Sequence, residues 1–139
     1  MEKDKTAHKL LANTMTSMKI PYVTLHGRSR ESRYTKEADW EYIKFCAQTL
    51  KENDSKTMLI GNGDILSHYD WNRHMEINKE FPENYATCMI ARGALIKPWV
   101  FQEIKEQRLI DISSSERLEM LKTFCRYGLG HGGVNITTK

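Results

Sequence analysis

The chain has 139 residues, 40% of them hydrophobic and 28% charged, a composition that excludes a wholly disordered protein and allows one domain with a modest core. Its formal net charge of +3 is too small to indicate a nucleic-acid partner unless the basic residues cluster locally. The three cysteines form no CxxC pair, so we expect no disulfide framework, no metal and a reducing, intracellular compartment. No apolar run approaches the roughly 20 residues of a membrane span, so we expect a soluble protein without a membrane segment.

Two units, each a helix followed by a strand, are predicted in the first half of the chain. Over residues 6–18 apolar side chains recur at three- and four-residue spacing, which predicts an amphipathic helix. Residues 21–26 are rich in β-branched and aromatic side chains, which is typical of a short buried strand. A second helical stripe runs over residues 40–50, and the apolar residues 58–61 predict the next strand.

The second half continues this alternation. Ser67 and Asp70 resemble a capping box, which predicts a helix over residues 68–78. Residues 86–91 predict a third strand. Pro98 suits the first turn of a further helical segment, because a proline there loses no intrahelical hydrogen bond.

A last helix is predicted after residue 113. Ser113 and Glu116 form a good capping box, and we place the end of this helix at Gly128 and Gly130. Its apolar positions are Leu118, Leu121, Phe124 and Cys125.

Strands that alternate with helices predict a parallel sheet, so the fold class is α/β. A doubly wound sheet usually has a glycine-rich turn after its first strand, and His26-Gly27-Arg28 is no such fingerprint. A TIM (β/α)8 barrel needs about 250 residues. Three strands would therefore form only part of a barrel.

Each predicted strand ends in a polar cluster. The clusters are His26-Gly27-Arg28, Gly61-Asn62-Gly63-Asp64 and Ala91-Arg92-Gly93. Because the carboxyl ends of parallel strands meet at one edge of a sheet, the clusters should line one ligand site. Gly61 and Gly63 would let the backbone approach a ligand closely, and the guanidinium of Arg92 suits phosphate oxygens. The pattern indicates a ligand that carries a phosphate.

Each of these residues also has a plainer interpretation by itself. The glycines would form an ordinary turn, His26 would be a solvated or core histidine, and Arg92 would be a surface cation. Their coincidence at the ends of successive strands favours the ligand site.

The loop of residues 28–36 holds four cations and one tyrosine. Cations contact phosphates and a tyrosine ring can stack on a base, so the loop suits an RNA surface. A solvated charged loop is the alternative.

At these residues the sequence resembles the tRNA-dihydrouridine synthases, and among them the eukaryotic subfamily that modifies position 47 of tRNA. The resemblance rests on the stretches VTLHGRSR (23–30), GNGDIL (61–66) and IARGALIKPW (90–99), on residues 33–36 and 38–40, and on residues 103–108 and 111–117, which are specific to the subfamily. It extends over nearly the whole chain.

The resemblance implies an FMN-dependent TIM barrel followed by a helical tRNA-binding domain. Its activity would be the reduction of uridine to 5,6-dihydrouridine in tRNA, with NADPH as the reductant. Residues 1–110 would be the C-terminal part of the barrel, with about three of its strands, and residues 111–139 the start of the helical domain. By position, the residues expected to bind FMN are His26, Asn62, Gly63, Asp64, Ala91 and Arg92. Those expected to contact the tRNA are Arg28 and Arg30.

The family's catalytic cysteine belongs to an earlier barrel segment, so we assign no catalytic residue here and expect an inactive fragment of the enzyme. None of Cys46, Cys88 and Cys125 takes that position. A non-catalytic truncated product that keeps partial RNA or flavin binding is the alternative, and residues 76–87 depart from the family in having a longer polar turn. We expect a cytoplasmic location, with the nucleus as a further one.

Overall fold

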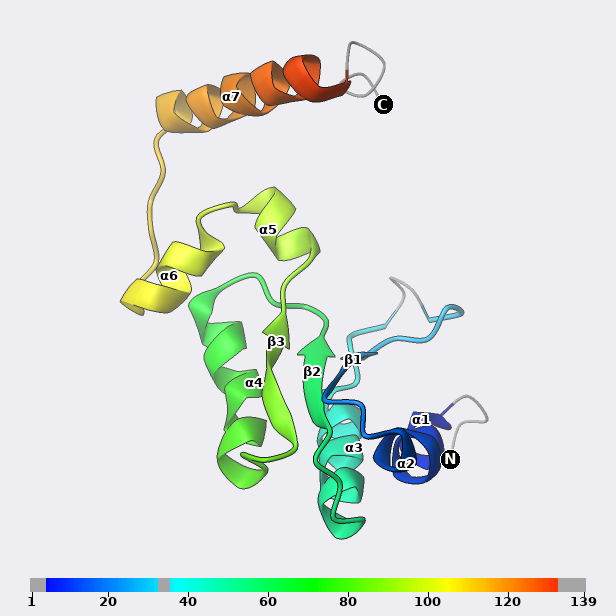
Figure 1. The fold of residues 1–139 in the computed structure, drawn as a ribbon. Coiled ribbons are helices and arrows are strands. Elements are labelled where there is room, and N and C mark those ends of the chain that lie inside the picture. Colours follow the sequence, from blue (N-terminus) through cyan, green and yellow to red (C-terminus); the bar gives the residue numbers. More distant parts are fainter. Residues whose placement is uncertain (1–4, 33–35, 133–139) are drawn as a thin grey trace. The chain divides into compact units, whose positions relative to one another are not determined.

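The computed structural model describes residues 5–32 and 36–132, and the chain divides into two compact units, Met1–Leu109 and Ile110–Lys139. The first unit is built on a three-stranded parallel sheet, and the described part of the second forms the helix α7 (Ser114–Gly132) (Figure 1). Within the described residues, no helix combines the length and the apolar character needed to cross a membrane.

The sheet has its strands in chain order, as the sequence predicts. Strands β1 (Tyr22–His26), β2 (Met58–Asn62) and β3 (Tyr85–Met89) lie side by side in the order β1-β2-β3, and both pairings are parallel. The last residues of β1 and β2 stand opposite each other, and the β2–β3 register shifts between Leu59 and Ile60. All three carboxyl ends therefore lie at the same edge of the sheet.

Two amphipathic helices pack with the strands around one core. Helix α3 (Trp40–Glu52) follows β1, and helix α4 (His68–Glu80) follows β2. Asp39 caps α3 and Ser67 caps α4, each by accepting a backbone N–H bond with its side-chain oxygen, as N-cap residues do. The buried core residues are Leu11, Ile43, Cys46, Ala47, Leu50, Leu59, Ile65, Ile77, Phe81, Tyr85 and Cys88.

The predicted N-terminal helix is present in three successive pieces. These are α1 (Ala7–Leu10), a π-helical segment η1 (Leu11–Met15) and α2 (Thr16–Met18). Leu11, only 2% exposed, anchors this helix in the core. The His8 ring lies 3.0 Å from the hydroxyl of Tyr42 on α3, so the helix is also held by a polar contact.

The structure adds one helix to the second half and corrects the end of another. A short helix, α5 (Arg92–Ile96), begins within the third polar cluster, for which the sequence predicts no helix or strand. It precedes α6 (Val100–Glu106), the segment predicted after Pro98. Helix α7 continues through Gly128 and Gly130 to Gly132, because a helical glycine costs only about 1 kcal/mol relative to alanine.

Residues 76–87, the segment that departs from the resembled family, form the end of α4, the turn that follows it and the start of β3. Phe81 and Asn84 are buried there, and the Asn84 amide donates to the carbonyl of Ser55 at 2.8 Å. The longer turn therefore packs against the amino-terminal edge of the sheet, opposite the edge that carries the polar clusters.

Candidate functional site

A cavity of about 580 Å³ opens at the carboxyl-terminal edge of the sheet, within the first unit. The loops that follow all three strands contribute to its wall. All eight residues predicted for the site line this cavity: His26, Arg28, Arg30, Asn62, Gly63, Asp64, Ala91 and Arg92. The fold thus brings together residues that are up to 66 positions apart in the sequence.

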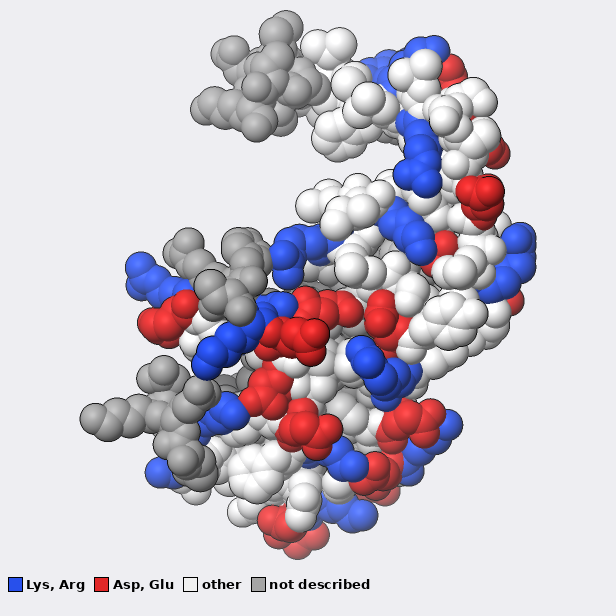
Figure 2. Space-filling model, turned by 180° about the vertical axis from the view of Figure 1, so that it is seen from behind, with Lys and Arg blue, Asp and Glu red and all other residues white. Residues whose placement is uncertain are grey.

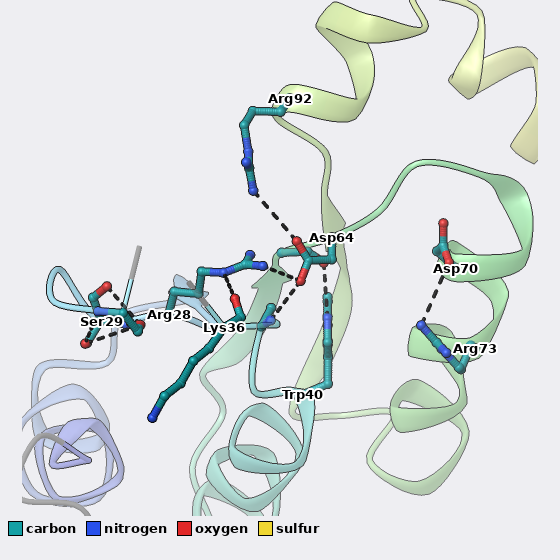
Figure 3. Close-up of polar contacts among 11 residues, drawn as sticks. Arg28, Ser29, Lys36, Trp40, Asp64, Asp70, Arg73 and Arg92 are labelled. Carbon is teal, nitrogen blue, oxygen red and sulfur yellow. Dashed lines mark hydrogen bonds and ion pairs between the residues drawn. The ribbon is translucent and has the colours of Figure 1, made fainter. Parts of the chain in front are cut away.

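Asp64 is the centre of the polar contacts in this cavity (Figure 3). One carboxylate oxygen accepts hydrogen bonds from the Arg28 guanidinium at 2.6 Å and from the Ala38 N–H at 2.8 Å. The other lies 3.7 Å from Nη2 of Arg92. Two arginines from different strand ends therefore approach one carboxylate from two sides.

These partners keep the Asp64 carboxylate ionised. Burial alone would raise the pKa of Asp64, but the hydrogen bonds from Ala38 and Arg28, together with the positive charges of Arg28 and Arg92, hold that pKa below its ordinary value. Three guanidinium groups and one carboxylate thus stand among the described residues that line the cavity, which gives it a positive balance.

His26 and Asn62 form a hydrogen-bonded chain across the ends of the strands. The Asn62 amide Nδ2 donates to the Met89 carbonyl at 2.9 Å. A carbonyl only accepts, so the Asn62 side-chain oxygen faces His26, whose Nδ1 lies 2.8 Å away. The proton of the neutral ring must therefore be on Nδ1, which leaves Nε2 of His26 as an acceptor.

Trp40 supports the loop after β2, a role that the sequence analysis missed. Its indole N–H donates to the Gly63 carbonyl at 3.1 Å, and its ring stacks on His74 with a centroid separation of 3.7 Å. Burial, followed by the charge of Arg73, lowers the pKa of His74 to about 4, so the stacked ring is neutral at pH 7. In the sequence, Trp40 stands out only as the first residue of the helical stripe 40–50 and as part of the matching stretch 38–40.

The structure gives Gly61, the first glycine of the second cluster, a different use from the one predicted. A Cβ on Gly61 would lie 2.5 Å from the Trp40 ring and 2.7 Å from the Tyr85 hydroxyl, so Gly61 makes room for the chain's own core and does not face a ligand. Gly63 has a φ of +146°, which favours glycine, and a Cβ there would collide with Ala38. Only Gly63 of the two lines the cavity.

The two described arginines of the basic loop, residues 28–36, differ in their exposure. Arg28 is largely buried, with 17% of its side chain exposed, whereas Arg30 is exposed. Arg33, Tyr34 and Thr35 of the predicted RNA surface lie outside the described residues. On the face shown in Figure 2, basic and acidic side chains alternate, so any RNA contact on this face would depend on local clusters of cations.

Two of the cysteines are buried in the core and neither lines the cavity. Burial raises the pKa of Cys46 and of Cys88 to about 11 in each case, so both stay protonated at neutral pH.

The cavity fits a ligand that carries a phosphate. Its volume is in the range of roughly 300 to 1,000 Å³ that is usual for small-molecule sites, and its wall combines guanidinium groups with apolar side chains such as Ile65, Leu66 and Ile96. Guanidinium groups match the geometry of phosphate oxygens, and the apolar side chains could contact an organic ring system.

Comparisons with known proteins give the family. Residues 2–127 match the family described as Dihydrouridine synthase (Dus). A Homo sapiens protein named tRNA-dihydrouridine(47) synthase [NAD(P)(+)]-like is 53% identical over 132 residues, which are 95% of this chain and 19% of that protein. An Arabidopsis thaliana protein of the same name is 55% identical over 111 residues, 80% of this chain and 15% of that protein. The tRNA-dihydrouridine(47) synthase [NAD(P)(+)] of Scheffersomyces stipitis is 41% identical over 146 residues, 96% of this chain and 23% of that protein. The chain spans about a fifth of the length of these relatives, and it belongs to the dihydrouridine synthase family.

Proposed function

We propose that this chain forms the flavin-phosphate side of the active site of a tRNA-dihydrouridine synthase, with FMN as cofactor and NADPH as reductant. The reaction is the reduction of uridine to 5,6-dihydrouridine in tRNA. The chemistry that the flavin supplies when bound is hydride transfer to the C5–C6 double bond of uracil. The names of the relatives support a nicotinamide reductant and a tRNA substrate.

The observation that carries the proposal is the shared cavity. Residues that the family motif assigns to the cofactor come from three separate strand ends, and all of them line one cavity with a positive balance of charge. Arg92 offers a guanidinium to a phosphate, and Gly63, which has no side chain, lines the same cavity. The hydrogen bonds that link Met89, Asn62 and His26 hold the His26 imidazole in one tautomer, so that its Nε2 can accept a hydrogen bond from the flavin or from the substrate.

The second unit and the basic loop have a proposed part in tRNA binding. We assign Arg30 to the tRNA because it is exposed on the rim of the same cavity. The division of the chain after Leu109 supports a boundary between a barrel segment, residues 1–110, and the start of a helical tRNA-binding domain, residues 111–139.

The proposal can be tested in a hybrid enzyme, defined as the Homo sapiens relative with its matched segment replaced by this chain. We expect the hybrid to retain FMN and to form dihydrouridine in tRNA with NADPH. Arg92→Ala should remove most of the flavin. Arg73→Ala is the matched control, because this arginine is 72% exposed on α4 and does not line the cavity.

The outcome decides between the proposed enzyme and a binding-only role. A hybrid that folds but binds no flavin, beside an unmodified relative that does, would contradict the proposal. Flavin binding without dihydrouridine formation would favour the non-catalytic alternative.

A further inference from the structure

The position of Asp64 raises a question about what a carboxylate does in a phosphate cavity. Asp64 lines the cavity and stays ionised, yet a carboxylate repels a phosphate at close range. Its oxygens are directed to Arg28 and Arg92 (Figure 3). One of them also accepts the hydrogen bond from the Ala38 N–H. Both carboxylate oxygens are therefore used in contacts with the chain's own donors, two of which are guanidinium cations, and neither serves to bind an anion.

Arg28 is held in the cavity wall by two short hydrogen bonds. Its Nη2 donates to Asp64 at 2.6 Å, and its Nε donates to the Lys36 carbonyl at 2.6 Å. Two contacts to one planar group fix both its position and its plane, and they use only two of its five N–H donors. With 17% of its side chain exposed, Arg28 is poorly placed to contact a macromolecule and well placed to contact a small ligand in the cavity.

We propose that Arg28 binds the cofactor phosphate together with Arg92, and that Asp64 is a positioning residue that sets the two guanidinium groups without contacting the phosphate itself. This inference rests on the proposed function. It moves Arg28 from the tRNA surface, where the family motif had suggested it, to the cofactor site, and it leaves Arg30 as the tRNA contact of this loop.

The direction in which Asp64→Ala changes phosphate binding distinguishes a positioning role from a purely electrostatic one. If Asp64 acted only through its negative charge, Asp64→Ala would strengthen phosphate binding because it removes a repulsion. If Asp64 positions the arginines, the same substitution removes one contact from each of them and weakens binding. Asp64→Asn keeps an oxygen that can accept from Ala38 and Arg28, so its effect should be smaller.

The experiment compares FMN with riboflavin, which has the same ring system and no phosphate. The apo form of the hybrid enzyme and of its variants is titrated with each flavin, and binding is followed by quenching of flavin fluorescence. We expect Asp64→Ala and Arg28→Ala to weaken FMN binding by roughly tenfold or more, since each removes charge-assisted hydrogen bonds. Riboflavin affinity should change less than about twofold, because the ring site is intact. Arg73→Ala, the matched control, should leave both affinities unchanged, because this exposed arginine of α4 does not line the cavity.

Riboflavin also reports on folding, since a collapsed site would lose both flavins. Tighter FMN binding by Asp64→Ala would overturn the positioning role. Unchanged FMN binding by Arg28→Ala, with weaker tRNA binding, would return Arg28 to the tRNA surface. Equal losses of FMN and riboflavin in Asp64→Ala, Asp64→Asn and Arg28→Ala would also contradict the inference. A parent hybrid that binds neither flavin would overturn the proposed function, and this inference with it.

Discussion

The packing behind the cavity predicts a large effect for a single methyl group at Gly61. An alanine Cβ there would lie 2.5 Å from Cζ3 of Trp40 and 2.7 Å from the Tyr85 hydroxyl, about 1 Å closer than ordinary van der Waals contact. Tyr85 is fully buried, and Trp40 is stacked on His74, so neither ring can move away freely. Overpacking of this kind typically costs 1–3 kcal/mol, and we expect Gly61→Ala to cost about 2–3 kcal/mol.

Gly61→Ala should also weaken the binding of the cofactor. Displacing the Trp40 ring would weaken its hydrogen bond to the Gly63 carbonyl, which supports the cavity wall. In the hybrid enzyme we expect the melting temperature, followed by circular dichroism, to fall by roughly 5 to 10 °C for a barrel-sized domain. Flavin content after gel filtration should fall as well.

Gly130→Ala is the matched control for this substitution. A Cβ on Gly130 would meet nothing within 4 Å, and the residue lies in α7. Alanine there should stabilise the helix by roughly 0.5–1 kcal/mol, so the melting temperature should not fall. A Gly61→Ala variant that melts with the parent and keeps its flavin would refute the reasoning from packing.

Three further predictions concern individual side chains. The pKa of His74 is lowered from 6.5 to about 4, so between these pH values the unfolded chain binds a proton that the folded chain does not. The free energy of unfolding should therefore fall by up to about 3 kcal/mol as the pH falls from 6.5 to 4. Urea titrations at pH 7 and pH 4.5 should show this loss in the parent hybrid and not in His74→Phe. Arg30→Ala should weaken tRNA binding at moderate salt and lower the slope of log affinity against log salt by about 1, while flavin content stays unchanged; an unaltered slope would argue against a phosphate contact. The ¹⁵N NMR spectrum of His26 at neutral pH should show the proton on Nδ1, and Asn62→Leu should abolish this preference; an Nε2–H tautomer in the parent would contradict the hydrogen-bonded chain.

Much of the fold could be predicted because the hydrophobic period changes clearly along the chain. Residues 21–26 and 58–61 stand out as short apolar runs between longer helical stripes, and each run is followed by polar residues. Parallel strands then require that these polar residues meet at one edge. The position of the cavity follows from this rule, although its contacts do not.

The missed features depend on contacts between residues far apart in the sequence. Nothing in the local sequence indicates that Arg28 would bind Asp64, 36 positions away, or that Trp40 would fill the space left by Gly61. Helix α5 has only five residues and one of them is Gly93, so it has too little periodic pattern to be recognised. The end of α7 was placed too early because glycine is a weak signal inside a helix that is otherwise well formed.

The most direct test of the account is to locate the phosphate of FMN in an experimental structure of the hybrid enzyme. The account predicts that the phosphate lies in the cavity at the carboxyl ends of β1, β2 and β3, beside Gly63 and within hydrogen-bonding distance of Arg28 and Arg92. A flavin bound with its phosphate outside this cavity, while Arg28 and Arg92 keep their contacts to Asp64, would contradict it.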